Sequence, residues 1–259
     1  MKLRTTLALM TAVVGFTTLA AQAQLTSEWE GSAYVRYTTR YVFRGDKKAG
    51  QSMQASVEFN PTAGQNGFYV GAWANQPFAS ERDFEFDLYG GYQYHWQGFV
   101  LEGGLAGYFF PQSSGSQTSY NYEFDVSVSR NITKNWGVTA TLYYDVRLQA
   151  LTPELSTGYR IPYTIEKYPA SLDFSAFLGY SNVNNYFPDA NLPQKWKDGY
   201  TYYGATISTT VYFTRNLGAA IGVQYGDTVG KAYTPVSLGG YGVNTADNLY
   251  GYISVKVRW

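Results

Sequence analysis

The feature that most constrains this chain is a repeated alternation of apolar and polar residues, in segments of about ten residues separated by turn residues. The clearest segment covers residues 83–96. One set of alternate positions is apolar or aromatic (Phe84, Phe86, Leu88, Gly90, Tyr92, Tyr94 and Trp96), and the other is largely polar (Asp83, Glu85, Asp87, Tyr89, Gly91, Gln93 and His95). A period of two places these sets on opposite faces of a β-strand. The segment length matches a tilted strand that crosses a membrane.

The same pattern recurs along the chain, and its repeats predict twelve strands. We place these strands at residues 32–44, 51–60, 68–76, 83–96, 99–110, 120–130, 136–148, 155–165, 171–181, 200–214, 218–227 and 247–259. Short and long connections then alternate, as they do in bacterial barrels with an even strand number. The alternation requires the eighth strand despite Pro162, and ten or fourteen strands are the alternatives. The predicted fold is an all-β, transmembrane, antiparallel up-and-down β-barrel of about 12 strands.

The chain begins with a segment typical of exported proteins. Lys2 and Arg4 precede an apolar stretch at residues 7–19, and Ala21-Gln22-Ala23 fits a cleavage site. We therefore predict a cleaved signal peptide at 1–23 and a single barrel domain at 24–259. Removal of residues 1–23 takes away two bases and no acid, which leaves 17 basic and 19 acidic residues. This slight acidic excess argues against a nucleic-acid partner.

Global composition agrees with a barrel at the bacterial outer membrane. The chain lacks cysteine, which excludes disulfides and thiolate chemistry, and its mean hydropathy is −0.28 because polar and apolar positions cancel. The last strand ends on Trp259, a pattern that the barrel-assembly machinery recognises. The other partners that we expect are outer-membrane lipid, lipopolysaccharide and small solutes. A soluble β-sandwich would also alternate, but it would not need a dozen strands near ten residues each.

Charged residues on the predicted inner face are sorted by sign. The first and last strands, which become neighbours on closure, carry the basic set Arg36, Arg40, Arg44, Lys256 and Arg258. The acidic set lies on the strands opposite and comprises Glu58, Glu85, Asp87, Glu102, Glu123, Asp125 and Asp145. A basic wall that faces an acidic wall would orient polar solutes by its transverse field. Alternatively, these charges pair across the lumen and plug it.

The outer face and the turns carry aromatic residues and glycines. The expected membrane-interface aromatics are Tyr41, Phe43, Phe84, Tyr94, Trp96, Trp136 and Trp259. Glycines also lie within the strands (Gly90, Gly91, Gly103, Gly104 and Gly107), where glycine gives curvature or a groove for a neighbouring tyrosine. The tenth and eleventh strands present small residues inward, which could leave open space.

We expect no enzyme activity, no cofactor and no metal site. His95 is the sole histidine, and the sequence places no nucleophile beside it. The carboxylates do not show the spacing of metal ligands on a loop. A barrel enzyme therefore ranks behind two other hypotheses, a channel and a structural or adhesive barrel with functional outer loops.

Three motifs between residues 33 and 110 resemble a known family. They are Tyr41-Val42-Phe43-Arg44-Gly45, then Gly67-Phe68-Tyr69-Val70-Gly71-Ala72-Trp73-Ala74-Asn75, then Glu85-Phe86-Asp87-Leu88-Tyr89-Gly90-Gly91-Tyr92. In this order and spacing they are similar to the TorF family of proteobacterial porins. The resemblance implies an outer-membrane barrel and a porin, and it supplies neither a substrate nor functional residues.

The predicted function is passive diffusion of small polar or charged solutes. The alternative is a plugged barrel whose outer loops bind ligands.

Overall fold

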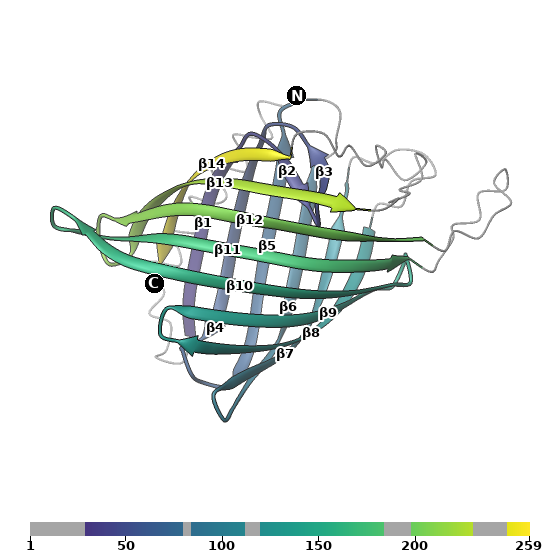
Figure 1. Ribbon diagram of the computed structural model, residues 1–259, viewed down its shortest axis with the longest axis horizontal. Coiled ribbons are helices and arrows are strands. Elements are labelled where there is room, and N and C mark those ends of the chain that lie inside the picture. The colour runs from purple at the N-terminus through teal and green to yellow at the C-terminus, as the bar shows by residue number, and fades with distance from the viewer. Residues whose placement is uncertain (1–28, 80–83, 112–119, 184–197, 230–247) are drawn as a thin grey trace, which may run out of the picture.

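The computed structural model describes residues 29–79, 84–111, 120–183, 198–229 and 248–259, which form a closed antiparallel barrel (Figure 1). Its twelve strands are β1 (Trp29–Thr38), β4 (Ser52–Pro61), β5 (Gly67–Pro77), β6 (Glu85–Trp96), β7 (Phe99–Phe109), β8 (Tyr120–Thr133), β9 (Trp136–Asp145), β10 (Ala150–Ile165), β11 (Tyr168–Val183), β12 (Asp198–Tyr212), β13 (Leu217–Val229) and β14 (Leu249–Arg258). The pairing of β1 with β14 closes the ring. The predicted twelve-stranded all-β barrel is confirmed, while the predicted signal peptide at 1–23 lies outside the described residues.

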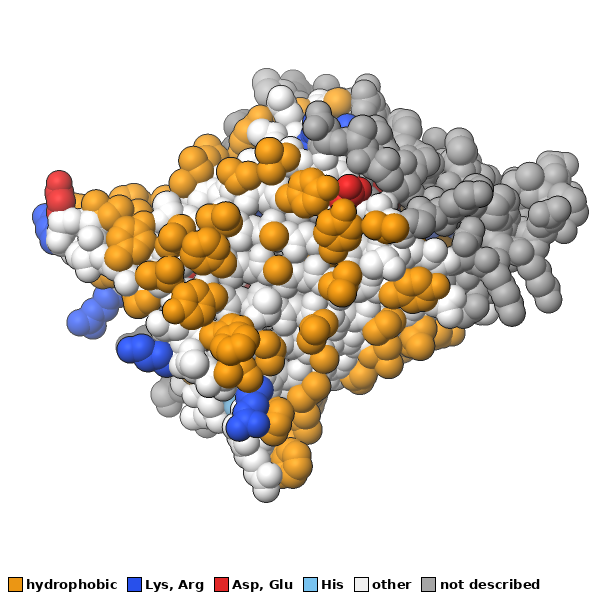
Figure 2. All heavy atoms as spheres, in the orientation of Figure 1, with side chains coloured by type: hydrophobic (Ala, Val, Ile, Leu, Met, Phe, Trp, Pro, Cys, Tyr) orange, Lys and Arg blue, Asp and Glu red, His pale blue; other side chains and the backbone are white. Residues whose placement is uncertain are grey.

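Each strand buries one face and exposes the other, as its alternation predicts. On β8, Phe124 and Val126 are 53% and 57% exposed, whereas Glu123 is 4% exposed. Figure 2 shows hydrophobic side chains spread over the outer face and charged side chains mostly at its margins. This polar interior and apolar exterior are what hydrocarbon requires of a barrel, and they are the reverse of a soluble sandwich. Among the described residues there is no helix long and apolar enough to cross a membrane.

The two ends of the barrel differ in their connections. We call the end where β1 begins and β14 finishes the terminal end, and the opposite one the loop end. Connections at the terminal end are short, at 62–66, 97–98, 134–135, 166–167 and 213–216. Those at the loop end cover 39–51, 78–84, 110–119, 146–149, 184–197 and 230–248, and only 146–149 is a tight turn. The predicted alternation of short and longer connections is thus largely confirmed.

The predicted eighth strand exists as β10, even though it contains two prolines. The β10–β11 hairpin extends past its neighbours at the terminal end (Figure 1). Pro162 pairs with Ser171 in this extension, where β10 has already lost its β9 neighbour. Pro153 lies at a break in the β10–β11 ladder, which passes from Leu151 directly to Glu154. Both prolines therefore occupy positions where a missing N–H group costs little.

The predicted first strand was too long at its loop end. β1 finishes at Thr38, and the chain then forms a separate hairpin from β2 (Tyr41–Phe43) and β3 (Asp46–Ala49). Its two-residue turn has positive φ at both Arg44 (48°) and Gly45 (73°), as a type I′ turn requires. Arg40 therefore lies in a connection and Arg44 at a turn, so neither belongs to the wall of the barrel.

Candidate functional site

The tip of the β2–β3 hairpin lies inside the barrel, where an ion pair holds it. Arg44 donates from both terminal nitrogens to Glu123 on β8, at 2.7 and 2.8 Å. Tyr108 on β7 donates to the same carboxylate at 3.0 Å, and the Tyr143 ring on β9 lies 4.3 Å from the guanidinium carbon. Burial lowers the pKa of Arg44, but the hydrogen bond and charge of Glu123 outweigh it, so the pKa is raised. The arginine therefore stays charged in this contact.

The other side of the hairpin turn rests against β13 and the residue just before β14. Asn248 donates to the carbonyl oxygen of Gly45 at 3.2 Å. A Cβ atom on Gly45 would lie 2.4 Å from the carbonyl oxygen of Asp227, so only glycine fits there. The hairpin therefore reaches β8 on one side of the ring and β13, close to β1, on the other.

Two predicted interface aromatics belong to this hairpin, and their predicted location is wrong. The Tyr41 ring lies 5.3 Å from that of Trp73, and its hydroxyl donates to Glu85 at 3.4 Å. The Phe43 ring contacts Tyr108 edge-on at 6.4 Å. These partners lie on the inner face, because β2 turns into the lumen instead of continuing β1.

Inward-facing tyrosines lie flat across glycines of the neighbouring strand. Tyr89 on β6 pairs with Gly71 on β5, which pairs with Glu58 on β4. A Cβ atom on Gly71 would lie 2.3 Å from the Tyr89 ring, so the ring occupies the space above the glycine. The hydroxyl of Tyr89 then reaches Glu58, two strands away, at 2.8 Å.

The same three-strand unit recurs on the other side of the barrel. Tyr202 on β12 crosses Gly179 on β11 and donates to Glu154 on β10 at 2.9 Å. A Cβ atom on Gly179 would lie 2.2 Å from the Tyr202 ring. We call each set a tyrosine–glycine–carboxylate unit. The unit lays a large ring against the wall, so the ring takes little space from the lumen.

A longer version of this unit spans four strands. Tyr69 on β5 lies across Gly91 and Gly104, towards Asp125 on β8. Glu102 on β7 also lies close to this hydroxyl. The expectation that a strand glycine makes room for a tyrosine is thus confirmed for Gly91 and Gly104. Sequence reasoning placed Tyr89 on the polar face of its strand but missed Tyr69, Tyr202 and Glu154 as lining residues, because the units become visible only once the register is known.

The acidic and basic residues of the lumen are distributed unequally. Arg44–Glu123, Lys48–Asp46 and Arg160–Asp173 form ion pairs. Inward-facing carboxylates without an ion pair in the described part of the chain include Glu58, Asp87, Glu102, Asp125 and Glu154. They lie on β4, β6, β7, β8 and β10, so the acidic wall is long and continuous.

The basic wall on β1 and β14 is shorter than predicted. The Arg36 guanidinium lies 4.2 Å from the Tyr252 ring and 5.0 Å from that of Tyr34. Lys256 donates to Thr210 at 3.3 Å, and Arg258 donates to Tyr212 at 3.1 Å near the terminal end. With Arg40 and Arg44 elsewhere, these three side chains are what remains of the predicted basic set.

The remaining predicted lumen residues have local partners. Asp145 accepts from Asn121 at 2.6 Å and from the backbone of Leu148 at 2.7 Å, so it supports the 146–149 turn.

The ring nitrogen Nε2 of His95 is buried without a hydrogen-bond partner among the described residues. No group of three or more potential metal-ligating residues occurs in that part of the chain.

The other predicted interface aromatics lie on or beside the outer face. Tyr94, Trp96 and Trp136 are 47%, 50% and 41% exposed. Phe84 immediately precedes β6 and is half-buried. Trp259 packs edge-on against Phe59 at 5.8 Å.

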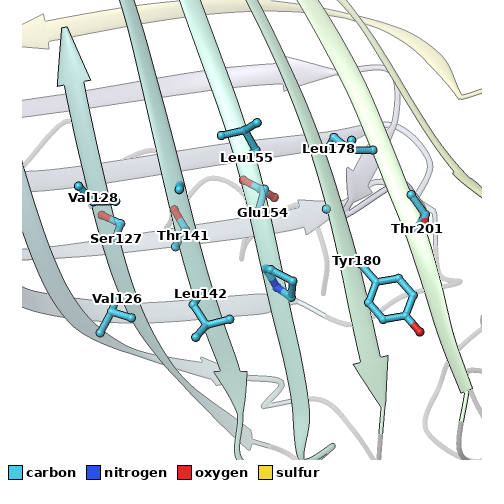
Figure 3. Close-up of a pocket in the computed structure, with 13 residues that line it drawn as sticks. Val126, Ser127, Val128, Thr141, Leu142, Glu154, Leu155, Leu178, Tyr180 and Thr201 are labelled. Carbon is cyan, nitrogen blue, oxygen red and sulfur yellow. The ribbon is translucent and has the colours of Figure 1, made fainter.

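The outer wall also carries a shallow apolar hollow over β8–β12 (Figure 3). Its outward-facing lining comprises Val126, Val128, Ala140, Leu142, Pro153, Leu155, Leu178 and Tyr180. Ser127 and Glu154, which alternate with these residues along β8 and β10, also line the hollow. The carboxylate of Glu154 accepts its hydrogen bond from Tyr202 on the inner side of the wall. Such an open apolar hollow suits contact with hydrocarbon and not passage of a polar solute.

Comparisons with known proteins support the fold and a family. A family model described as "Bacterial protein of unknown function (Gcw_chp)" matches residues 22–239. No curated protein matches the chain in sequence. Similar solved structures include the KdgM porin in complex with disordered oligogalacturonate (15% identity, TM-score 0.51, 87% of this chain and 98% of that one) and the NanC porin (14%, 0.50, 87% and 98%). A third is the COG4313 outer membrane channel from Pseudomonas putida F1 (9%, 0.50, 92% and 97%). The fold is therefore that of porin-like outer-membrane barrels.

Proposed function

Because the chain belongs to the Gcw_chp family of bacterial proteins of unknown function, its activity must be argued from the barrel itself. We propose that it is an outer-membrane, porin-like channel for passive diffusion of small polar or charged solutes. The resemblance of its first third to TorF porins supports the same proposal. Acidic residues on β4 and β6–β10 and basic residues on β1 and β14 would face each other across the solute path.

The observation that carries the proposal is the way in which the wall accommodates its large side chains. Tyr69, Tyr89 and Tyr202 lie across glycines and end at carboxylates instead of projecting into the lumen. On β12 and β13 most of the inward positions between Tyr202 and Tyr212 and before Gln224 are small (Gly204, Thr206, Ser208, Thr210, Gly218, Ala220 and Gly222). Twelve strands also exceed the number that side chains alone fill. A polar, flat-walled interior is suited to water and solutes.

The β2–β3 hairpin supports a second candidate, a plugged barrel. Its tip is held to β8 by Arg44 and to Asn248, just before β14, by a hydrogen bond, so it could obstruct the lumen. In that case the function would lie in the long connections at the loop end. The two longest of these connections, at 184–197 and 230–248, lie almost entirely outside the described residues.

Conductance of the refolded protein in a planar lipid bilayer tests the first candidate against the second. We expect stepwise current increases, each from insertion of one open barrel. A shift to slower migration on heating in detergent gels would verify that the inserted material is folded. Folded barrel that never conducts would contradict the channel and favour the plugged barrel.

The remaining assignments follow from the channel proposal. The outward aromatics Tyr94, Trp96 and Trp136 would lie at the boundary with lipid and lipopolysaccharide. The last strand, which ends on Trp259, would be the segment that the assembly machinery binds. We assign the protein no catalytic role, because the channel needs none of the chemistry of His95.

A further inference from the structure

We propose that the lumen selects cations, and that it binds small organic cations bearing an ammonium or guanidinium group beside Asp87, beneath the β2–β3 hairpin. This inference rests on the proposed channel function and specifies its solute class. Three observations carry it: the neutral partners of the lumen carboxylates, the commitment of the basic side chains, and the surroundings of Asp87.

The first observation is that tyrosines, and not bases, donate to two of the unpaired carboxylates of the wall. Glu58 accepts from Tyr89 at 2.8 Å and Glu154 from Tyr202 at 2.9 Å. A phenol hydroxyl supplies a hydrogen bond but no positive charge. Each carboxylate is thereby oriented while its negative charge remains available to a passing solute. Glu58 and Asp125 also lie close enough to Glu102 to interact with it electrostatically. The negative potentials of these three carboxylates therefore add up inside the lumen.

The second observation is that the described basic groups cannot cancel this charge. Arg44, Lys48 and Arg160 are each committed to another carboxylate. Lys256 and Arg258 gather around Tyr212 near the terminal end. Of the other described basic residues, Arg40, Lys47 and Arg147 lie at the loop end, and Arg130, Lys134, Lys167 and Arg215 lie at the terminal end. On the wall between the two ends this leaves Arg36, between two tyrosine rings, against the five carboxylates without an ion pair. The middle of the lumen is therefore negative.

The third observation is independent of the charge count and concerns Asp87. This residue is 8% exposed, and its Oδ1 atom has no hydrogen-bond partner in the described part of the chain. A buried carboxylate oxygen without a donor is costly unless a ligand supplies one. By register Asp87 lies between Trp73 and Tyr108 on the inner face, and the Tyr41 ring of the hairpin packs on Trp73.

A buried carboxylate flanked by aromatic rings has the chemistry that recognises organic cations, and here a second carboxylate, Glu85, lies nearby on the same face. The carboxylate supplies the opposite charge, and the ring faces attract a cation through their quadrupoles. An ammonium or guanidinium group also supplies the N–H donors that Oδ1 lacks. An anionic solute would meet repulsion at the same point. The KdgM porin of similar fold was solved with oligogalacturonate, an anion, and the acidic wall here points to the opposite preference.

The zero-current potential of bilayers carrying the refolded protein, measured in a KCl gradient, tests the inference. We expect K⁺ to be favoured over Cl⁻ by roughly tenfold, the low end of the enrichment that a focused field produces. Asp87→Asn and the double variant Glu58→Gln, Glu154→Gln should each reduce this ratio by about half or more. Both changes retain side-chain size and hydrogen-bonding capacity while removing charge. Agmatine, which carries an ammonium and a guanidinium group, should block the wild-type K⁺ current more strongly than that of Asp87→Asn.

Glu166→Gln provides the matched control, because it removes the same charge from the exposed β10–β11 turn at the terminal end. It should leave the potential unchanged. Preference for Cl⁻, or equal ratios in the wild type and the lumen variants, would overturn the inference and leave the channel intact. A folded barrel without any conductance would overturn the proposed function instead. Migration of each variant in detergent gels before and after heating identifies any that fail to fold.

Discussion

At the scale of single residues, the glycines of the inner face determine how much of the lumen stays open. The Tyr202 ring lies over Gly179 on the inner face, and it can lie flat there because glycine has no Cβ atom. Gly158 faces the same lumen from β10, but the nearest atom to its virtual Cβ is a carbonyl oxygen at 3.8 Å. The same substitution can therefore be made at Gly179, where a side chain would displace the Tyr202 ring, and at Gly158, where no ring lies in the way.

Gly179→Val should displace the Tyr202 ring into the lumen and break its bond to Glu154. We expect a smaller single-channel conductance and a destabilisation of about 1–3 kcal/mol, the usual cost of overpacking. Gly158→Val adds the same volume to the same face, and it should change conductance far less. Bilayer recordings of the two variants make the comparison. Equal losses of conductance would show that the ring position does not matter.

At the scale of elements, alternation predicts strands well but does not reveal where a strand leaves the sheet. Residues 39–44 continue the alternation of β1, so the prediction ran through them. Gln97-Gly98, the two residues between the predicted strands 83–96 and 99–110, forms a hairpin turn with positive φ at both residues (48° and 82°). Arg44-Gly45 has the same geometry and was missed, because the residues before it looked like an uninterrupted strand. Local pattern cannot show that Glu123, far along the chain, captures Arg44.

The hairpin is the element whose release should alter the current. Arg44→Ala removes the ion pair and leaves Glu123, whose side chain is 5% exposed, without its cation. Breaking a buried pair in this way costs about 3–5 kcal/mol. We expect a detached hairpin tip, with larger and noisier single-channel currents.

Arg160→Ala is the corresponding control, since it breaks the Arg160–Asp173 pair, where the arginine side chain is 55% exposed. Pairs exposed to this degree contribute little, about 0–1 kcal/mol. Its currents should match those of the wild type. If Arg44→Ala also conducts like the wild type, the hairpin does not narrow the path.

At the scale of the whole molecule, the barrel is one ring, and β1 with β14 completes it. Gly31 and Trp259 exchange both backbone hydrogen bonds at 3.0 Å, which fastens the first strand to the last residue. A Cβ atom on Gly31 would lie 2.1 Å from the Trp259 ring. The terminal aromatic was predicted from sequence as an assembly signal and interface residue. Its packing over Gly31 could not be predicted, because it depends on the register of strands that are joined only on closure.

Gly31→Ala should therefore weaken closure and destabilise the entire barrel, since no strand of a closed sheet can leave without exposing two edges. We expect the variant to lose its folded migration in detergent gels at a lower temperature than the wild type. Gly251→Ala is the matched control on β14, because its virtual Cβ meets only a carbonyl oxygen at 3.7 Å, an ordinary contact. If both variants unfold at the wild-type temperature, closure does not depend on the Trp259 ring, and the backbone pairing of β1 with β14 alone supplies it.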